Sequence, residues 1–173
     1  LSPLSAIWSE KMKLIVNADK NWAIGNKGEL LAHLSVDMKF FRAKTTGNTV
    51  ILGRKTLATF PGGNPLKNRR NIVLTHKADF DGNGAEVAHS VEEVLELVKN
   101  ENTDNVYVIG GESVYSQFMD YCDTAYITVF DKTFEADVHI ENLDMSDKWQ
   151  LKDESEDYEE KGISYCFRTY VKK

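Results

Sequence analysis

Short runs of consecutive Val, Ile and Leu, bounded by glycine or polar residues, constrain the fold of this chain more than any other feature. The clearest are residues 49–52, 71–75 and 106–109. A strand that is apolar at every position has both faces covered, as strands in a parallel sheet do. The other β-type runs are residues 14–18, 125–130 and 164–171. The pattern therefore predicts a largely parallel central sheet.

Segments of helical periodicity lie between these runs. Residues 35–44 begin with Ser35 at an expected N-cap. The inward positions of this helix recur at three- and four-residue steps, namely Leu34, Met38 and Phe41. Residues 90–99 open with a capping-box pattern, and residues 112–119 follow a glycine pair. Because helices alternate with all but the last strands, we expect one α/β domain of βαβ units that ends in antiparallel pairing.

The composition is that of a folded domain without a metal or disulfide framework. Of the 173 residues, 42% are apolar and 28% are charged. Since no apolar run could span a bilayer or form a signal segment, we expect a cytoplasmic protein without a membrane partner. Cys122 and Cys166 are expected to be inert core thiols, and the scattered histidines predict no metal site. Residues 1–11 are expected to be an extension or an expression remnant, and residues 12–173 to be the domain.

The formal charge of −6 hides two segments of opposite sign. Residues 39–77 hold nine Lys or Arg and no acid, whereas residues 141–161 hold nine acids and three lysines. The acidic segment is interpreted as a solvated face that contributes solubility. The cations of the basic segment lie at strand ends and loops without interleaved exposed aromatic residues, so nucleic-acid binding is not expected. They are better suited to small anionic ligands.

Three places in the sequence could carry chemistry. Asp37 shares the inward face of the first helix with Phe41; it is either an acid of the first helical turn or a carboxylate that holds paired N–H donors. Residues 50–56 form a strand that ends in Gly-Arg-Lys-Thr at a helix start, and residues 73–77 repeat this layout, so each is either a solvated turn or a phosphate site. The Gly110-Gly111 pair after residues 106–109 would let a ligand approach the backbone.

Taken together and in order, the segments of this chain resemble the dihydrofolate reductase family. The segments that carry the resemblance are Leu14-Ile-Val-Asn17-Ala18, Trp22-Ala-Ile24-Gly25, Asp37-Met-Lys-Phe-Phe41, Val50-Ile-Leu-Gly53-Arg54-Lys55-Thr56, Arg69-Arg-Asn71-Ile-Val-Leu74-Thr75, Val108-Ile-Gly110-Gly111-Glu-Ser-Val-Tyr115, Ala125-Tyr-Ile-Thr128 and Ser164-Tyr-Cys-Phe. The resemblance runs from about Met12 to the end of the chain.

This resemblance implies a fold and an activity. The fold would be a central eight-stranded, mostly parallel sheet with an antiparallel C-terminal strand and four flanking helices. The activity would be the NADPH-dependent reduction of 7,8-dihydrofolate to 5,6,7,8-tetrahydrofolate, with hydride transfer to pterin C6 and protonation at N5. The expected partners are dihydrofolate and antifolate inhibitors such as methotrexate and trimethoprim, and the expected state is a monomer.

The resemblance also implies the roles of individual residues. Asp37 would hold the pterin amino group and ring N–H, Thr128 would support it through its hydroxyl and an ordered water, and Arg69 would bind the glutamate α-carboxylate. The other substrate-side positions are Ile15, Asn17, Leu30, Leu31, Phe41 and Leu66. The cofactor positions are Ala18, Ile24, Gly25, Gly53, Arg54, Lys55, Thr56, Leu74, Thr75, His76, Ile109, Gly110, Gly111, Glu112, Ser113, Val114 and Tyr115. Arg54 and Lys55 would select NADPH over NADH through the 2′-phosphate, and the glycine pair would carry a cis peptide.

The chain departs from the family pattern in the loop that would close over nicotinamide. Many relatives have a Pro-Trp pair before the His or Asn, Leu and Pro that lead into the aspartate helix, whereas this chain has Leu30-Leu31-Ala32-His33-Leu34-Ser35. Asn17 also replaces a small residue. Activity is still expected, because neither departure removes the carboxylate or the phosphate site. The alternatives are a pyrimidine reductase of riboflavin synthesis, which would not explain Asp37, Phe41 and Arg69 together, and a non-catalytic NADPH- or antifolate-binding homologue.

Overall fold

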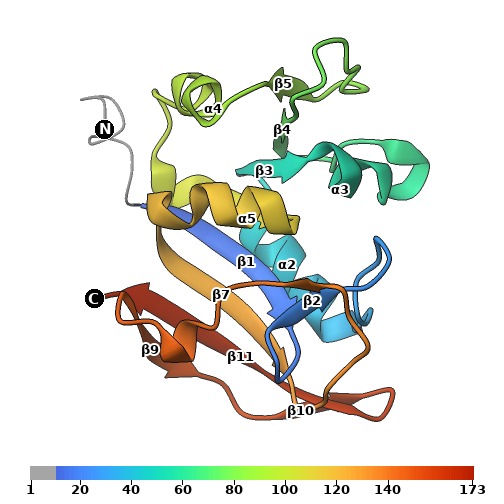
Figure 1. Ribbon diagram of the computed structural model, residues 1–173, viewed down its shortest axis with the longest axis vertical. Coiled ribbons are helices and arrows are strands. Elements are labelled where there is room, and N and C mark those ends of the chain that lie inside the picture. The colour runs from blue at the N-terminus through green and yellow to red at the C-terminus, as the bar shows by residue number, and fades with distance from the viewer. Residues whose placement is uncertain (1–10) are drawn as a thin grey trace.

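One large sheet organises the computed structural model, which describes residues 11–173 (Figure 1). Its strand order is β10-β11-β7-β1-β6-β3-β4-β5, and β9 also pairs with β11. The strands of this sheet are β1 Met12–Ala18, β3 Thr49–Gly53, β4 Arg70–Leu74, β5 Glu86–Ala88, β6 Val106–Gly110, β7 Cys122–Phe130, β9 Trp149–Glu154, β10 Tyr158–Glu160 and β11 Ile163–Lys172. A second small sheet pairs β2 Ala23–Gly25 with β8 Val138–His139. Most of the expected N-terminal extension lies outside the described residues.

The pairing pattern confirms a mostly parallel sheet with an antiparallel C-terminal strand. β1 runs parallel to β6 and β7, β3 runs parallel to β4 and β6, and β4 runs parallel to β5. β11 is antiparallel to β7. The central runs are buried at nearly every position, as their uninterrupted apolar sequences predict.

Two short strands, β9 and β10, share the edge of the sheet next to β11, which we call the outer edge. β9 pairs with the C-terminal part of β11 and β10 with its N-terminal part, so nine strands fill the eight expected positions. Ser155 lies at the break, where its backbone N–H donates to Phe167 O and its Oγ accepts from Phe167 N, both at 2.8 Å. These bonds keep the edge continuous where regular pairing stops.

Four α-helices flank the sheet, as expected. They are α2 Ser35–Thr45, α3 Arg54–Ala58, α4 Val91–Leu97 and α5 Glu112–Phe118. Helices α4 and α5 pack on one face in a core cluster with Leu14 and Ile51, while α2 and α3 lie on the other face with Ile15 and Val50. Neighbouring strand residues thus enter opposite cores. Short 3-10 helices occupy Pro61–Gly63, Thr103–Asn105, Met119–Tyr121 and Leu143–Met145.

Helix α2 differs from its prediction at both its start and its inward face. Leu34 is the N-cap and Ser35 is the first helical residue, so the expected Ser35 cap is wrong. Met38 is 49% exposed, whereas Asp37 and Phe41 are half-buried and Thr45 is buried. The buried stripe is therefore rotated by about one residue, because α2 packs Phe40 against Tyr126 of β7 and Phe167 of β11.

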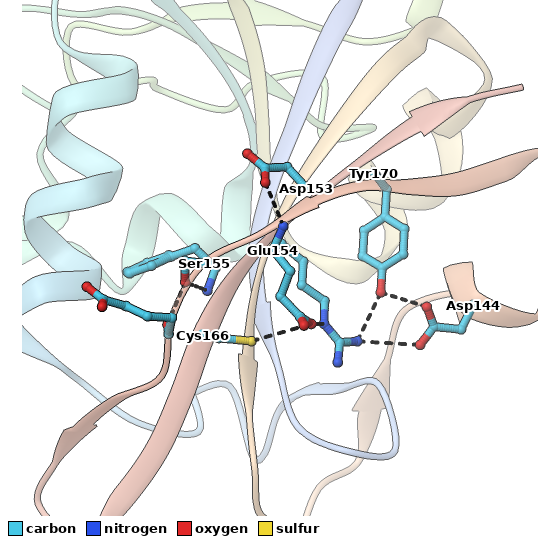
Figure 2. Close-up of polar contacts among 9 residues, drawn as sticks. Asp144, Asp153, Glu154, Ser155, Cys166 and Tyr170 are labelled. Atoms are coloured by element: carbon cyan, nitrogen blue, oxygen red, sulfur yellow. Dashed lines mark hydrogen bonds and ion pairs between the residues drawn. The ribbon is translucent and has the colours of Figure 1, made fainter.

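A polar cluster ties the last strands together (Figure 2). Arg168 on β11 donates to Glu154 on β9 and to the Tyr170 hydroxyl, and the hydroxyl donates to Asp144 Oδ1 at 2.8 Å. Burial and the bond to Asp144 raise the pKa of Tyr170 to about 12. Cys166 lies beside this cluster.

Both cysteines lie in the core of the protein. Cys122 and Cys166 are buried and free, and burial raises the pKa of Cys122 to about 12, as an inert core thiol requires. Within residues 11–173, no helix is long and apolar enough to cross a membrane. The same residues contain no group of three or more His, Cys, Asp or Glu side chains arranged to hold a metal ion.

Candidate active site

The carboxyl ends of β1, β3, β4 and β6 meet at one edge of the sheet. Ligands of α/β proteins bind at this edge, because the loops that follow parallel strands converge there. Most of the predicted site residues belong to these strand ends or to the first turns of α2, α3 and α5. The topology therefore brings together motifs that are far apart in sequence.

Asp37 is the carboxylate among the positions predicted to bind substrate. Its Oδ1 accepts from Thr128 Oγ1 at 2.6 Å, and its Oδ2 accepts from Asn17 Nδ2 at 2.7 Å. The β1–β7 register pairs Asn17 with Thr128, which places both donors beside the first turn of α2. Burial raises the pKa of Asp37 above its ordinary value, although the hydrogen bonds from Thr128 and Asn17 act in the opposite direction.

This carboxylate is suited to binding a planar, nitrogen-rich ring. A half-buried Asp37 has remaining lone pairs for paired N–H donors, and charge-assisted bonds to such donors strengthen where water is scarce. Ile15, Phe41 and Leu66 pack in one cluster beside the α2 face. They form an apolar wall of the kind expected along the rings of a folate.

A separate cavity of about 340 Å³ lies on the other face of the sheet. Val129, Cys166 and Arg168 line it. By strand alternation these side chains point away from Thr128 and from Phe167, its partner on β11. The cavity is therefore not part of the Asp37 site.

Arg69 is held at the far end of the apolar wall. Its Nε donates to Lys67 O at 2.9 Å and its Nη1 donates to Thr45 Oγ1 at 3.1 Å. Burial, and then the nearby charge of Arg42, lower the pKa of Arg69. A second cation beside a partly buried guanidinium favours an anionic ligand, since a carboxylate would relieve their repulsion.

The predicted phosphate turn lies where β3 meets α3. Arg54 and Lys55 are exposed in the first turn of α3, and Thr56 is half-buried. A Cβ on Gly53 would lie 3.2 Å from Val114 Cγ2. The Gly53 backbone and the start of α5 therefore lie close together, and a side chain at residue 53 would require Val114 to shift by a few tenths of an ångström.

The glycine pair completes this turn. The Gly110-Gly111 peptide bond is cis, and Gly110 has a φ of 125°. A Cβ on Gly110 would lie 3.2 Å from the Tyr115 hydroxyl, and one on Gly111 would lie 3.5 Å from Thr56 Oγ1. A side chain at residue 110 would thus be strained and would crowd Tyr115, whereas one at residue 111 would make an ordinary contact with Thr56. With glycine at these positions, backbone groups and cations line the space between the ends of β3 and β6, as a phosphate-bearing ligand requires.

The neighbouring strand end extends this surface. The β3–β4 register pairs Gly53 with Leu74, so Thr75 and His76 follow β4 beside Arg54. Thr75 is buried and its Oγ1 accepts from Lys77 N at 3.1 Å, while His76 is exposed. The arrangement could accommodate an extended nucleotide across two strand ends.

Several of the remaining predicted cofactor positions are apolar and buried. Ala18, Ile24 and Ile109 are at most 9% exposed, and Gly25 and Val114 are also buried. Tyr115 is fully buried and donates from its hydroxyl to Ile15 O at 2.8 Å. Burial raises its pKa, so the hydroxyl stays protonated.

Several predicted positions lie at the margin of this arrangement. Glu112 and Ser113 are exposed, and Glu112 Oε2 accepts from His139 N at 3.3 Å. Leu30 is 54% exposed and is not placed with the apolar wall. Leu31 packs instead beside a cluster that contains Phe130, as does Ala32.

Sequence reasoning missed the residues that hold the loops in place. Asn71 accepts from Leu66 N and donates to Leu66 O and Arg69 O, which fixes the loop that carries Arg69. Buried Asp19 accepts from Asn21 N, Ala23 N and Phe134 N, and Asp137 Oδ2 accepts from Lys27 N at 3.1 Å. The only available signal was an acid or amide next to a predicted strand, which also describes ordinary turns.

Comparisons with known proteins agree with this geometry. A sequence model described as dihydrofolate reductase matches residues 11–172. The chain is 34% identical to a dihydrofolate reductase of Staphylococcus haemolyticus, over 95% of this chain and 98% of the relative. It is also 34% identical to that of Bacillus subtilis, over 94% of this chain and 95% of the relative.

A solved structure shows the same architecture. The dihydrofolate reductase from Enterococcus faecalis, complexed with NADP(H) and RAB-propyl, matches with a TM-score of 0.82 and 34% identity, covering 94% of this chain and 96% of that chain. The chain therefore belongs to the dihydrofolate reductase family.

Proposed function

We propose that this chain reduces 7,8-dihydrofolate to 5,6,7,8-tetrahydrofolate with NADPH, and that Asp37 anchors the pterin. The observation that carries this assignment is the half-buried carboxylate of Asp37, which accepts one hydrogen bond on each oxygen from Thr128 and Asn17. Family membership supports the reaction and the cofactor. The roles of individual residues follow from the resemblance to the family, and the geometry of the site supports them.

On the substrate side, Asp37 would accept from the pterin amino group and ring N–H. The apolar wall of Ile15, Phe41 and Leu66 would pack along the rings, and Arg69 would bind the glutamate α-carboxylate. Asn71 would act indirectly, because it holds the loop on which Arg69 lies. The substrate is thus fixed at both ends.

On the cofactor side, the residues present fit a dinucleotide phosphate. The space that Gly53, Gly110 and Gly111 keep free of side chains adjoins the cations Arg54 and Lys55. When bound, NADPH supplies the hydride that pterin C6 receives. Arg54 and Lys55 would favour NADPH over NADH, since a 2′-phosphate adds about two negative charges near them.

Asp37 has a positioning and polarising role in the proton step. One carboxylate cannot both hold the pterin amino edge and reach a distant N5, so we infer that a water molecule delivers that proton. Thr128 would hold the carboxylate and this water in order. Ala32 stands where many relatives resembling this chain have a loop tryptophan, so Ala32→Trp tests whether the departure alters catalysis.

The proposal also includes the extent of the domain, its oligomeric state and its location in the cell. We propose that residues 12–173 form the reductase domain and that it acts as a monomer in the cytoplasm. The divided, acidic outer edge of the sheet supports a monomer, because it offers no long apolar strand for pairing. Sedimentation of the purified chain checks this point.

A single assay tests the reaction. NADPH absorbance is followed with dihydrofolate at neutral pH, with and without methotrexate, and Asp79→Asn, which changes an exposed acid, serves as a matched control. We expect methotrexate-sensitive oxidation of NADPH. Methotrexate binding without turnover would indicate a non-catalytic homologue, and turnover only with the pyrimidine precursor of riboflavin would indicate the other reductase. No NADPH consumption at micromolar enzyme would contradict the proposal.

A further inference from the structure

The start of helix α2 contains a backbone donor that its own sequence leaves without a cap. Leu34 is the N-cap and no side chain within the helix caps the first turn. Ser35 is the first helical residue, a position where the N–H group has no partner inside the helix. Asp37 follows two residues later, so this turn determines where the pterin anchor lies.

Glu160, from the far end of the chain, supplies the missing cap. Ser35 N donates to Glu160 Oε2 at 2.8 Å and to Oε1 at 3.1 Å, and Ser35 Oγ donates to Oε2 at 3.2 Å. A carboxylate at a helix N-terminus is favoured both by these bonds and by the helix dipole. A side chain 125 residues away in sequence thus holds the turn that bears Asp37.

The turn that carries Glu160 is itself well defined. Glu160 pairs with Ile163 across a two-residue hairpin, and the residues between them, Lys161 and Gly162, have positive φ values of 55° and 75°. This is the geometry that connects two antiparallel strands tightly. Lys161 Nζ also donates to His33 O at 2.8 Å, next to the helix start.

Apolar side chains also pack between the β10–β11 hairpin and the start of α2. Leu34, Ile163 and Tyr165 are buried in one cluster that joins the helix start to β11. The hairpin therefore contacts the start of α2 through a carboxylate, an ammonium group and a small core. If the first turn of α2 unfolded, the bonds to Glu160, the bond from Lys161 and the packing of this apolar cluster would all be lost.

We propose that Glu160 is a positioning residue for Asp37, acting through the backbone N–H and hydroxyl of Ser35. The inference rests on the proposed role of Asp37 as the pterin anchor. Many relatives have proline where this chain has Ser35; proline lacks the N–H that Glu160 binds and is favoured at the first helical position. Because this chain has serine at position 35, its helix start has a backbone N–H that needs an acceptor, and Glu160 provides it.

The backbone allows a direct test, because Ser35→Pro should fit without strain. The preceding residue, Leu34, has φ −116° and ψ 133°, which is the conformation that a residue before proline prefers. Ser35→Pro removes both donors to Glu160 while retaining a well-formed helix start. Glu160→Ala removes the carboxylate in either background, but it removes a cap only where Ser35 is present. Glu159→Ala removes a neighbouring exposed charge as a matched control.

The experiment measures the dissociation constants of methotrexate and NADPH, together with the KM for dihydrofolate, the kcat and the Tm. In the natural background, Glu160→Ala should raise the methotrexate dissociation constant and the dihydrofolate KM by about three- to tenfold. NADPH affinity should not change. Glu160→Gln, which retains an acceptor, should restore part of the loss, and Glu159→Ala should have no effect.

In the Ser35→Pro background, Glu160→Ala should change neither value. An equal loss in both backgrounds, no loss in either, or a fall in Tm without any change in ligand affinity would overturn the proposal. Asp37→Asn separates this outcome from a failure of the proposed function. If Asp37→Asn retains normal methotrexate affinity, Asp37 is not the anchor; if it loses affinity while Glu160→Ala does not, only the role of Glu160 is wrong.

Discussion

Thr128 Oγ1 donates a 2.6 Å hydrogen bond to Asp37 Oδ1, which joins the end of β7 to the first turn of α2 across 91 residues of sequence. The Thr128 hydroxyl is the donor and the Asp37 oxygen is the acceptor. A donor to a carboxylate oxygen stabilises the ionised form of the carboxyl group. It leaves the other lone pairs of Asp37 available to a ligand. The carboxylate that we propose as the pterin anchor is thus oriented by the protein itself.

Asp37→Asn should strongly reduce the reduction of dihydrofolate at neutral pH. The amide cannot provide the charge that the pterin N–H groups require, and loss of one partner of a buried charged pair costs about 2–5 kcal/mol. We expect kcat/KM for dihydrofolate to fall by about 30-fold to several thousand-fold. The loss should shrink in acid, where the substrate is already protonated, and unchanged activity across the pH range would refute the assignment.

The same substitution should stabilise the ligand-free protein at neutral pH. Burial raises the pKa of Asp37 above 3.8, so the folded state binds this proton more tightly than the unfolded chain does. The associated stability is fully present below pH 3.8 and is lost as pH rises through the folded pKa. An asparagine does not ionise and avoids this loss.

Urea denaturation at several pH values measures this effect. The stability gain of Asp37→Asn over the natural protein should grow from acid to neutral pH, while Asp79→Asn at an exposed site should show no such trend. A gain that is constant with pH would show that ionisation of Asp37 is not its cause.

Arg54→Gln and Lys55→Gln, made singly, should weaken NADPH binding selectively. A hydrogen bond to a charged group contributes about 1.5–3 kcal/mol, so we expect the NADPH KM to rise about tenfold or more for the residue that contacts the 2′-phosphate. The NADH KM should change little. Lys152→Gln on β9 removes the same charge far from this turn and is the control. Equal effects on the two cofactors would remove both cations from this role.

Tyr170→Phe should lower stability without affecting catalysis. The hydroxyl donates to Asp144 and accepts from Arg168, and its loss should cost about 1 kcal/mol, or roughly 2–4 °C in Tm. Asp144→Ala should cost less stability in the Tyr170→Phe background than in the natural protein, because the Tyr170–Asp144 bond is then already lost and only the Arg168–Asp144 ion pair remains to be removed. A change in the dihydrofolate KM would show that this cluster communicates with the opposite face of the sheet.

Local sequence patterns predicted those parts of the molecule that depend on local interactions. Continuous Val and Ile runs predicted the parallel strands, and Ser90 caps α4 through Glu93 N, as its pattern indicates. The strand ends that are followed by glycine or by cations lie side by side, as expected of parallel strands.

The features that were missed depend on partners distant in sequence. Ser35 has the composition of an N-cap, yet the cap comes from Glu160. Met38 has the spacing of a core residue but lies at the exposed side of α2. No local pattern specifies that Asn71 holds the Arg69 loop or that β9 and β10 share one edge. Such pairings require the assembled sheet.

The divided outer edge has a consequence for the protein at high concentration. An edge strand exposes unpaired N–H and C=O groups to which another polypeptide could add, and long apolar edges invite fibrous assembly. Here the edge is broken at Ser155 and flanked by Glu154, Glu156, Asp157 and Glu159. If two copies approached through this edge, short segments of like charge would face each other and repel. The acidic residues near the end of the chain therefore oppose strand pairing between molecules.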